Sequence, residues 1–388
     1  MTRTESPPPP IAPANQSIEV TGVRRGRRLR RRRRRFTTLA LAFLLVCVAA
    51  AGVVLFTTDR GTPSPKVVPK PTHVSAAGGV VSVDNSRANC IDLSVPNGVL
   101  TQSQLSGVEG TTGVTFDCLE VFTDQDPLWS NWVNPWATAT QSDGWDSWLA
   151  ASSRHQIVLG QQLIPDSECT TVCADPLTWE DQCAAGAFDK YATQLGQNLV
   201  KAGAGNSVIR LGKEFNGDWE NDWIGTTTAE QLAWAKCFDN EVTAMRSVAG
   251  AHFLFDWNPA ACDAGFSLSD AYPGDAYVDI IGIDAYDTDC ESHASVAEEG
   301  WLPYLQSGGE GSIASIMNFA RVNGKPISFP EWGLVGSDDP TYVDGIASII
   351  ATSDVAYQSY FDCGCDNITP LGSGAPNSLA AYKYAFGG

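Results

Sequence analysis

Short apolar runs of strand length recur along the chain from residue 113 onward, and several are followed by a longer helix-like stretch. The runs lie at residues 113–122, 155–164, 207–214, 251–257, 277–284, 325–330 and 354–361. The helix-like stretches include residues 184–202, 228–249 and 310–323. Such alternation is typical of parallel βα units. With a weaker run near residues 79–83, the pattern predicts an α/β fold of the (β/α)8 TIM-barrel class.

A different pattern occupies the first 77 residues. Residues 1–35 are rich in Pro and then in Arg, with little apolar material to bury, which predicts a disordered tail. Residues 36–57 carry no charge and are dominated by Leu, Ala and Val, so they are long enough to cross a bilayer as one helix. Residues 58–77 contain four Pro and are expected to form a semi-extended stalk. Residues 78–388 then provide about 310 residues for one large barrel domain.

The distribution of charge predicts how this apolar segment is oriented. Eleven of the 25 basic residues and only two of the 44 acidic residues lie within residues 1–35. Basic flanks stay cytoplasmic, so we expect a single-pass membrane anchor with the large domain outside the cell. A nucleic-acid-binding arm is an alternative reading of the Arg run, but the rest of the chain is acidic. A cleaved signal peptide is a second alternative, since Ala49–Ala51 offers small residues, although the apolar run continues beyond them.

The cysteines support an exterior location for the large domain. Of the eleven Cys, one lies inside the apolar segment and ten follow it. An even number beyond the segment predicts disulfides in an oxidising compartment, with pairings that cannot be read from the sequence. Zinc is the competing interpretation, but Cys169-x3-Cys173 and Cys363-x-Cys365 lack paired Cys-x2-Cys spacing and have no nearby His. We therefore expect neither a metal nor a cofactor.

Two segments each place a glutamate at the end of a short β-like run. Glu214 follows Val208-Ile209-Arg210-Leu211, and Glu331 is framed by Phe329-Pro330 and Trp332-Gly333. Cleavage of a glycosidic bond with retention needs two carboxyl groups, one to protonate the departing oxygen and one to attack the anomeric carbon. The two groups must hold different protonation states at one pH, which requires different surroundings. The alternative reading is that both are ordinary solvated charges at strand ends.

These segments resemble glycoside hydrolase family 26, the β-mannanase family. Residues 210–219, Arg-Leu-Gly-Lys-Glu-Phe-Asn-Gly-Asp-Trp, are similar to the family's acid/base segment, and residues 330–333, Pro-Glu-Trp-Gly, to its nucleophile segment. Residues 272–287, which end in Asp284-Ala285-Tyr286-Asp287, are similar to the segment of its sixth strand. The resemblance spans residues 110–385 and implies a TIM barrel. One departure is Lys213, because the family usually has His before the acid/base Glu.

By this resemblance, Glu214 is the acid/base, Glu331 the nucleophile and Tyr286 the residue that orients the nucleophile. Arg210 is a supporting charge and Trp219 a platform on which a sugar stacks. Aromatic and polar residues near the predicted strand ends complete the expected substrate site. The expected substrate-binding residues are Arg210, Lys213, Asn216, Trp219, Trp223, Asp256, Trp257, Tyr286 and Trp332.

The sequence thus predicts a membrane-anchored, extracellular, retaining glycoside hydrolase with a monomeric catalytic domain. Its expected substrate is a neutral β-linked polysaccharide such as a mannan, a glucan or a related cell-envelope glycan, because an acidic domain repels nucleic acid and anionic polymers. Two alternatives stay open. One is a catalytically degenerate barrel that only binds glycan, which the departure at Lys213 would favour. The other is a scaffold protein of the cell envelope.

Overall fold

A computed structural model of the chain describes residues 88–93, 102–123, 128–135, 145–165, 178–262, 265–288, 296, 300–365 and 368–387. All of them belong to one compact unit, Ala77–Gly388. The predicted tail, membrane segment and stalk, together with the weak run near residues 79–83, lie outside the described residues. Among the helices that are described, none is long and apolar enough to cross a membrane.

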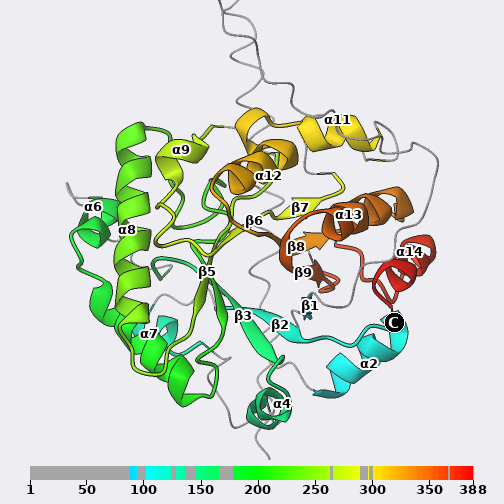
Figure 1. Ribbon diagram of the computed structural model, residues 1–388, viewed down its shortest axis with the longest axis horizontal. Helices are drawn as coiled ribbons and strands as arrows, with labels where there is room; N and C mark the ends of the chain where they lie inside the picture. The colour runs from blue at the N-terminus through cyan, green and yellow to red at the C-terminus, as the bar shows by residue number, and fades with distance from the viewer. Residues whose placement is uncertain are drawn as a thin grey trace, which may run out of the picture. The chain divides into compact units, whose positions relative to one another are not determined.

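Parallel strands form the centre of this unit and helices surround them (Figure 1). The strands are β1 (Ala88–Asp92), β2 (Cys118–Phe122), β3 (Gln156–Gln161), β4 (Val208–Leu211), β5 (Leu254–Trp257), β6 (Ile280–Gly282), β7 (Ala285–Tyr286), β8 (Ile327–Gly333) and β9 (Val355–Phe361). The helices are α2 (Gln102–Thr112), α3 (Trp129–Trp132), α4 (Trp145–Ala151), α6 (Trp179–Ala184), α7 (Asp189–Lys201), α8 (Thr228–Arg246), α9 (Leu268–Ala271), α11 (Trp301–Gln306), α12 (Ile313–Val322), α13 (Pro340–Thr352) and α14 (Pro376–Phe386), with the 3-10 turn η2 (Gly309–Gly311).

The sheet closes on itself into a barrel. Its strand order is β6-β5-β4-β3-β2-β1-β9-β8-β7, every pair is parallel, and an additional pairing between β6 and β8 completes the ring. Because β7 follows β6 after two residues and also pairs with β8, the two share one position in the ring. The result is an eight-position parallel barrel, which confirms the predicted TIM-barrel class for the described residues.

Six of the seven stronger apolar runs contain a strand, and the run at residues 325–330 covers the first part of β8, which continues to Gly333. The helix predictions hold with one change. Residues 228–249 and 310–323 contain α8 and α12, but residues 184–202 contain the end of α6 and all of α7. The break comes at Gly186, which has a φ of 84° that favours glycine. The first strand, β1, is not predicted by the apolar pattern, because Asn89 and Asp92 interrupt it.

Alternation along the strands sorts the barrel interior into layers. Residues two apart on a strand share a face. A buried apolar layer comprises Cys90, Cys118, Val158, Val208, Ile280 and Tyr357. Two residues further toward the C-terminal strand ends come Glu120, Gly160, Arg210 and Gly282. A polar layer therefore lies directly above an apolar one, on the side where TIM-barrel enzymes carry their active sites.

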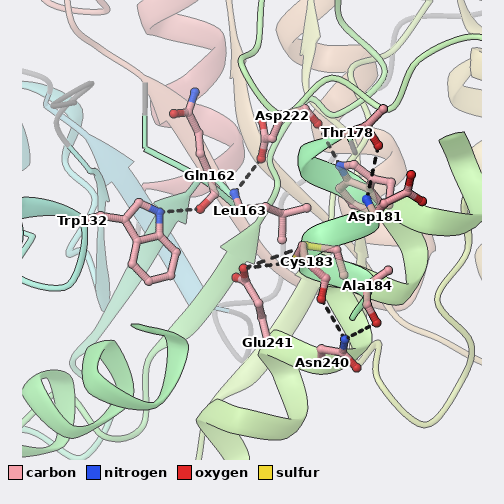
Figure 2. The surroundings of a disulfide bond; sticks show 12 residues. Trp132, Gln162, Leu163, Thr178, Asp181, Cys183, Ala184, Asp222, Asn240 and Glu241 are labelled. Carbon is pink, nitrogen blue, oxygen red and sulfur yellow. Dashed lines mark hydrogen bonds between the residues drawn. A yellow bond between two sulfur atoms is a disulfide. The ribbon is translucent and has the colours of Figure 1, made fainter. Parts of the chain in front are cut away.

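Disulfides occur as the cysteine count predicts. The described pairs are Cys90–Cys118, Cys183–Cys237 and Cys363–Cys365, and Cys262 is also disulfide-bonded. The first joins β1 to β2 inside the barrel, and the second joins α6 to α8. Beside the second disulfide, Glu241 is buried and Asn240 donates to the carbonyl oxygens of Cys183 and Ala184 at 2.9 Å (Figure 2). Cys169 and Cys173 lie outside the described residues.

Candidate active site

A buried arginine lies at the centre of the polar layer. Arg210 has no exposed surface, and its guanidinium donates to Glu120, to Asp284 at 2.5 Å and to Asn258 Oδ1 at 3.0 Å. Its Nη1 also lies 3.7 Å from Glu331 Oε2. A guanidinium presents several donors in a rigid plane, so one side chain can organise carboxylates from different strands.

Burial and charge oppose one another in this cluster. Desolvation raises the pKa of Glu120 to about 7 and raises the pKa of Asp284 as well, despite the attraction of Arg210. Burial alone would lower the pKa of the Arg210 guanidinium, but the charges of Asp284, Glu120 and Glu331 outweigh it and raise that pKa. Arg210 therefore stays protonated, and its positive charge stabilises the surrounding carboxylates.

Glu331 lies on β8 and receives a strong hydrogen bond from a tyrosine. The Tyr286 hydroxyl donates to Glu331 Oε1 at 2.5 Å. Burial and the neighbouring charge of Glu331 raise the pKa of Tyr286, so the phenol keeps its proton and remains a donor. The backbone of β7 is held in turn, because Tyr304 and Tyr342 donate to the carbonyl oxygens of Tyr286 and Ala285 at 2.6 Å. The orientation of Tyr286 toward Glu331 thus depends on helices α11 and α13.

Glu214 follows β4 in an unusual backbone conformation. Its φ is 50°, a left-handed value that costs a non-glycine residue on the order of 1–3 kcal/mol and tends to occur at functional sites. The Glu214 N–H donates to the Asn258 carbonyl at 2.8 Å, and the Trp219 indole N–H donates to Glu214 Oε2 at 2.7 Å. Gly217 makes room for this indole, since a Cβ there would lie 2.3 Å from the Trp219 ring.

The carboxylates of Glu214, Asp284 and Glu331 converge. One oxygen from each lies within 4.8 Å of the others, and all three residues are buried. Retaining glycosidases hold their two carboxyl groups about 5–5.5 Å apart, whereas inverting ones leave about 6.5–9.5 Å. Three such carboxylates could also hold a metal ion. Here Arg210 already pairs with Asp284 and Glu331, which is the positive charge that a metal would otherwise supply.

Lys213 lies beside this group and is paired. Its ammonium donates to Glu220 Oε1 at 2.8 Å and lies 5.3 Å from the centre of the Phe122 ring. Burial alone would lower the pKa of Lys213, but the negative charges of Glu220, Glu214 and Glu331 raise it. The ammonium therefore remains charged at neutral pH.

A sequence profile and a curated relative point to one family. The glycosyl hydrolase family 26 profile matches residues 147–299 of the chain. A mannan endo-1,4-beta-mannosidase from Bifidobacterium adolescentis is 28% identical over 184 residues, which is 43% of this chain and 18% of that protein. The chain is glycoside hydrolase family 26-like. The resemblance predicted from the residues is thereby confirmed.

Solved structures share the barrel of this family 26-like chain. An endo-beta-1,4-mannanase from Cellulomonas fimi superposes with a TM-score of 0.52 at 17% identity, covering 76% of this chain and 70% of that one. A family 26 beta-mannanase from Bacteroides ovatus superposes with a TM-score of 0.52 at 12% identity, covering 78% of this chain and 88% of that one. A Bacillus subtilis mannanase superposes with a TM-score of 0.51 at 14% identity, covering 77% of this chain and 86% of that one. At these identities the likeness shows the fold.

The structure does not bring every predicted substrate residue to the site of the family 26-like barrel. Asp256 is fully buried and accepts hydrogen bonds from the Ser328 and Tyr357 hydroxyls at 2.6 Å. Trp257 and Trp332 are also fully buried and pack in aromatic clusters. These three side chains hold the barrel together, so we exclude them from the proposed substrate contacts.

Asn216 and Trp223 both lie on the segment between β4 and α8. Both amide atoms of Asn216 bind the backbone of Ala260, at 2.9 Å and 2.8 Å, which joins the loop after β4 to the loop after β5. Trp223 is half-buried against the core. Its partial exposure leaves it as a prediction for a sugar contact, whereas Asn216 is only 7% exposed and supports the loops.

Sequence reasoning missed three residues that surround Arg210. Glu120, Asn258 and Asp284 each contact its guanidinium and none was predicted. A signal was available, because each lies near the end of a predicted strand run, where side chains of a parallel barrel converge. Asp284 also belongs to the segment that resembles the family's sixth strand.

Proposed function

We propose that this protein is an O-glycosyl hydrolase of the endo-mannanase type that cleaves a neutral β-linked polysaccharide with retention of configuration. The observation that carries the proposal is the convergence of Glu214 and Glu331, whose carboxylate oxygens lie within 4.8 Å at the C-terminal side of the barrel. That separation suits a direct attack by one carboxylate and leaves little room for a water molecule between the two. The family 26 match and the mannosidase relative support the reaction class.

The contacts suggest how the two carboxylates divide the work. In the first step, Glu331 attacks the anomeric carbon while Glu214 gives its proton to the departing glycosidic oxygen. Tyr286, which donates to Glu331 Oε1, orients the nucleophile, and Arg210 places a positive charge beside it. In the second step, Glu214 removes a proton from water, the resulting oxygen attacks the same carbon, and the bond to Glu331 breaks. Two inversions at one carbon give net retention.

The test is a panel of neutral polysaccharides given to the full-length protein, including β-mannan, glucomannan, mixed-linkage β-glucan and xylan. We expect β-mannan to be cut within the chain, so that oligosaccharides of several lengths appear early. The first product detected by NMR should carry the β configuration at its new reducing end, because retention preserves it. Binding without cleavage would instead establish the glycan-binding barrel, and the absence of both would favour a scaffold protein.

We also propose that residues 36–57 anchor the protein in the membrane with the barrel outside the cell. The support is the uncharged apolar run and the Arg-rich flank that precedes it. A protease added to intact cells should release an acidic fragment whose N-terminus lies within residues 58–77, while residues 1–35 stay protected. Protection of the acidic domain would overturn this orientation. A mature N-terminus near Gly52 would show cleavage in place of anchoring.

A further inference from the structure

Two side-chain contacts cross the turn that follows β4. Lys213 contacts Glu220, and the next residue, Glu214, contacts Trp219, which precedes Glu220 in the chain. Lys213 Nζ donates to Glu220 Oε1 at 2.8 Å, and Trp219 Nε1 donates to Glu214 Oε2 at 2.7 Å. The Lys213–Glu220 and Trp219–Glu214 contacts both lie within residues 213–220, so they belong to one short loop.

The Lys213–Glu220 pair is fixed from outside this loop. Gln162, on the segment after β3, donates through its amide nitrogen to the second oxygen of Glu220 at 2.7 Å. The stem of Lys213 lies against Gly160, where a Cβ would come within 3.2 Å of Lys213 Cδ. The exposed fractions of the two side chains are 15% for Lys213 and 6% for Glu220. An ion pair with this little solvent keeps its geometry and is weakly screened.

We propose that Glu220 is a positioning residue that holds the Lys213 ammonium beside Glu214, and that the balance between these two opposite charges sets the pH at which Glu214 gives up its proton. The inference rests on the proposed acid/base role of Glu214. A positive charge favours the carboxylate form and a negative charge favours the protonated form. Lys213 and Glu220 therefore act on Glu214 in opposite directions, so removing both charges should change the pKa of Glu214 less than removing either one.

Other charged and titratable groups face Glu214 and stay unchanged in the test. They are Asp284 and Glu331, whose oxygens lie within 4.8 Å of Glu214, together with Arg210 and Tyr286, which bind those two residues. Trp219 donates to Glu214 but does not titrate in this range. Asp218 and Asp222 lie on the same loop and also stay unchanged, and the buried Asp222 carboxylate accepts from the Leu163 N–H at 2.7 Å. Lys213 and Glu220 are replaced because they form the ion pair next to Glu214 and do not contact Arg210.

The experiment is a charge cycle on the full-length protein with Lys213→Met, Glu220→Gln and the double variant. The pH dependence of kcat/KM on β-mannan reports the free enzyme's acid in its alkaline limb. We expect Lys213→Met to move that limb to higher pH by about 1 unit or more, since a nearby cation lowers a carboxyl pKa by roughly 1–3 units. Glu220→Gln, which can still accept from Lys213, should move it to lower pH. The double variant should return close to the wild type.

A second readout does not depend on activity. Isotope-edited NMR of the glutamate carboxyl carbons, with the Glu214 signal assigned through Glu214→Gln, gives the titration of Glu214 directly in each variant. The control is Lys236→Met, which removes the same charge from an exposed lysine on α8 and should leave both readouts unchanged. Opposite shifts for the two single variants support the inference. The same titration midpoint for Glu214 in all variants would overturn it, even when the wild type cleaves mannan. If the variants show these shifts but the wild type cleaves no glycan, only the proposed function is overturned.

Discussion

Glu331→Ala should abolish cleavage of β-mannan, and sodium azide or formate should restore turnover of an activated aryl glycoside. The expectation follows from the placement of Glu331, whose Oε1 accepts from Tyr286 and whose carboxylate lies close to Glu214. Without the side chain no glycosyl-enzyme forms, but a small anion can occupy the vacated space and attack the anomeric carbon. The adduct should have the inverted configuration, which NMR of the product detects.

Glu214→Ala should fail in a different way. General acid help contributes about 10²–10⁴-fold, so cleavage of polysaccharide should fall by that order. Aryl glycosides with good leaving groups need no proton in the first step and should retain more activity. The matched control is Asp354→Ala, an exposed carboxylate at the N-terminal side of β9, away from the site. Equal turnover in the wild type and in both glutamate variants would assign any hydrolysis to a contaminant, and the glycan-binding barrel would then be the better account.

Part of this site could be predicted from the sequence because parallel strands bring their C-terminal ends together. Glu214, Tyr286 and Glu331 all follow predicted strand runs, and the structure places them in one cluster. Their roles remain proposals, but their proximity did not require a structure. Strand ends give the level of a residue along the barrel axis, and these three side chains lie close together at that level.

The direction of a side chain at that level was harder to predict. One residue along a strand turns a side chain from the interior to the helices. Asp256 is buried and accepts hydrogen bonds from Ser328 and Tyr357, and the Trp257 ring packs against Phe215. The predictions for these residues used their position at a strand end and lacked the partners that other strands of the closed barrel supply, such as Ser328 on β8 and Tyr357 on β9.

The partners of Arg210 were missed for a related reason. Its guanidinium binds Glu120 and Asp284, which are 90 and 74 residues away along the chain. No local pattern links such positions. Only the closure of the barrel brings these strands within reach of one arginine, and the first strand of that barrel was itself not predicted from the apolar pattern. The pairing of several buried carboxylates with one arginine therefore depends on the whole fold and not on a local sequence pattern.

Arg210→Met should destabilise the domain strongly, and more so at higher pH. Removing one partner from a buried charge network costs about 3–5 kcal/mol, because it leaves the other charges uncompensated. Here the stranded groups are Glu120 and Asp284, and burial already raises the pKa of both with Arg210 present. Without the guanidinium their pKa values rise further. The folded variant then keeps protons that the unfolded chain releases above about pH 4.5.

The sign of the pH dependence follows from that difference in bound protons. Where the folded state holds more protons than the unfolded state, the free energy of unfolding falls as pH rises. Urea unfolding of Arg210→Met at about pH 5 and about pH 8 should therefore show the larger loss, relative to the wild type, at the higher pH. Arg154→Met is the control, since the Arg154 side chain is 56% exposed and solvent can replace its bidentate contact with Asp117. A loss for Arg210→Met that is the same at both pH values would mean that packing of the side chain, and not its charge, holds the cluster together.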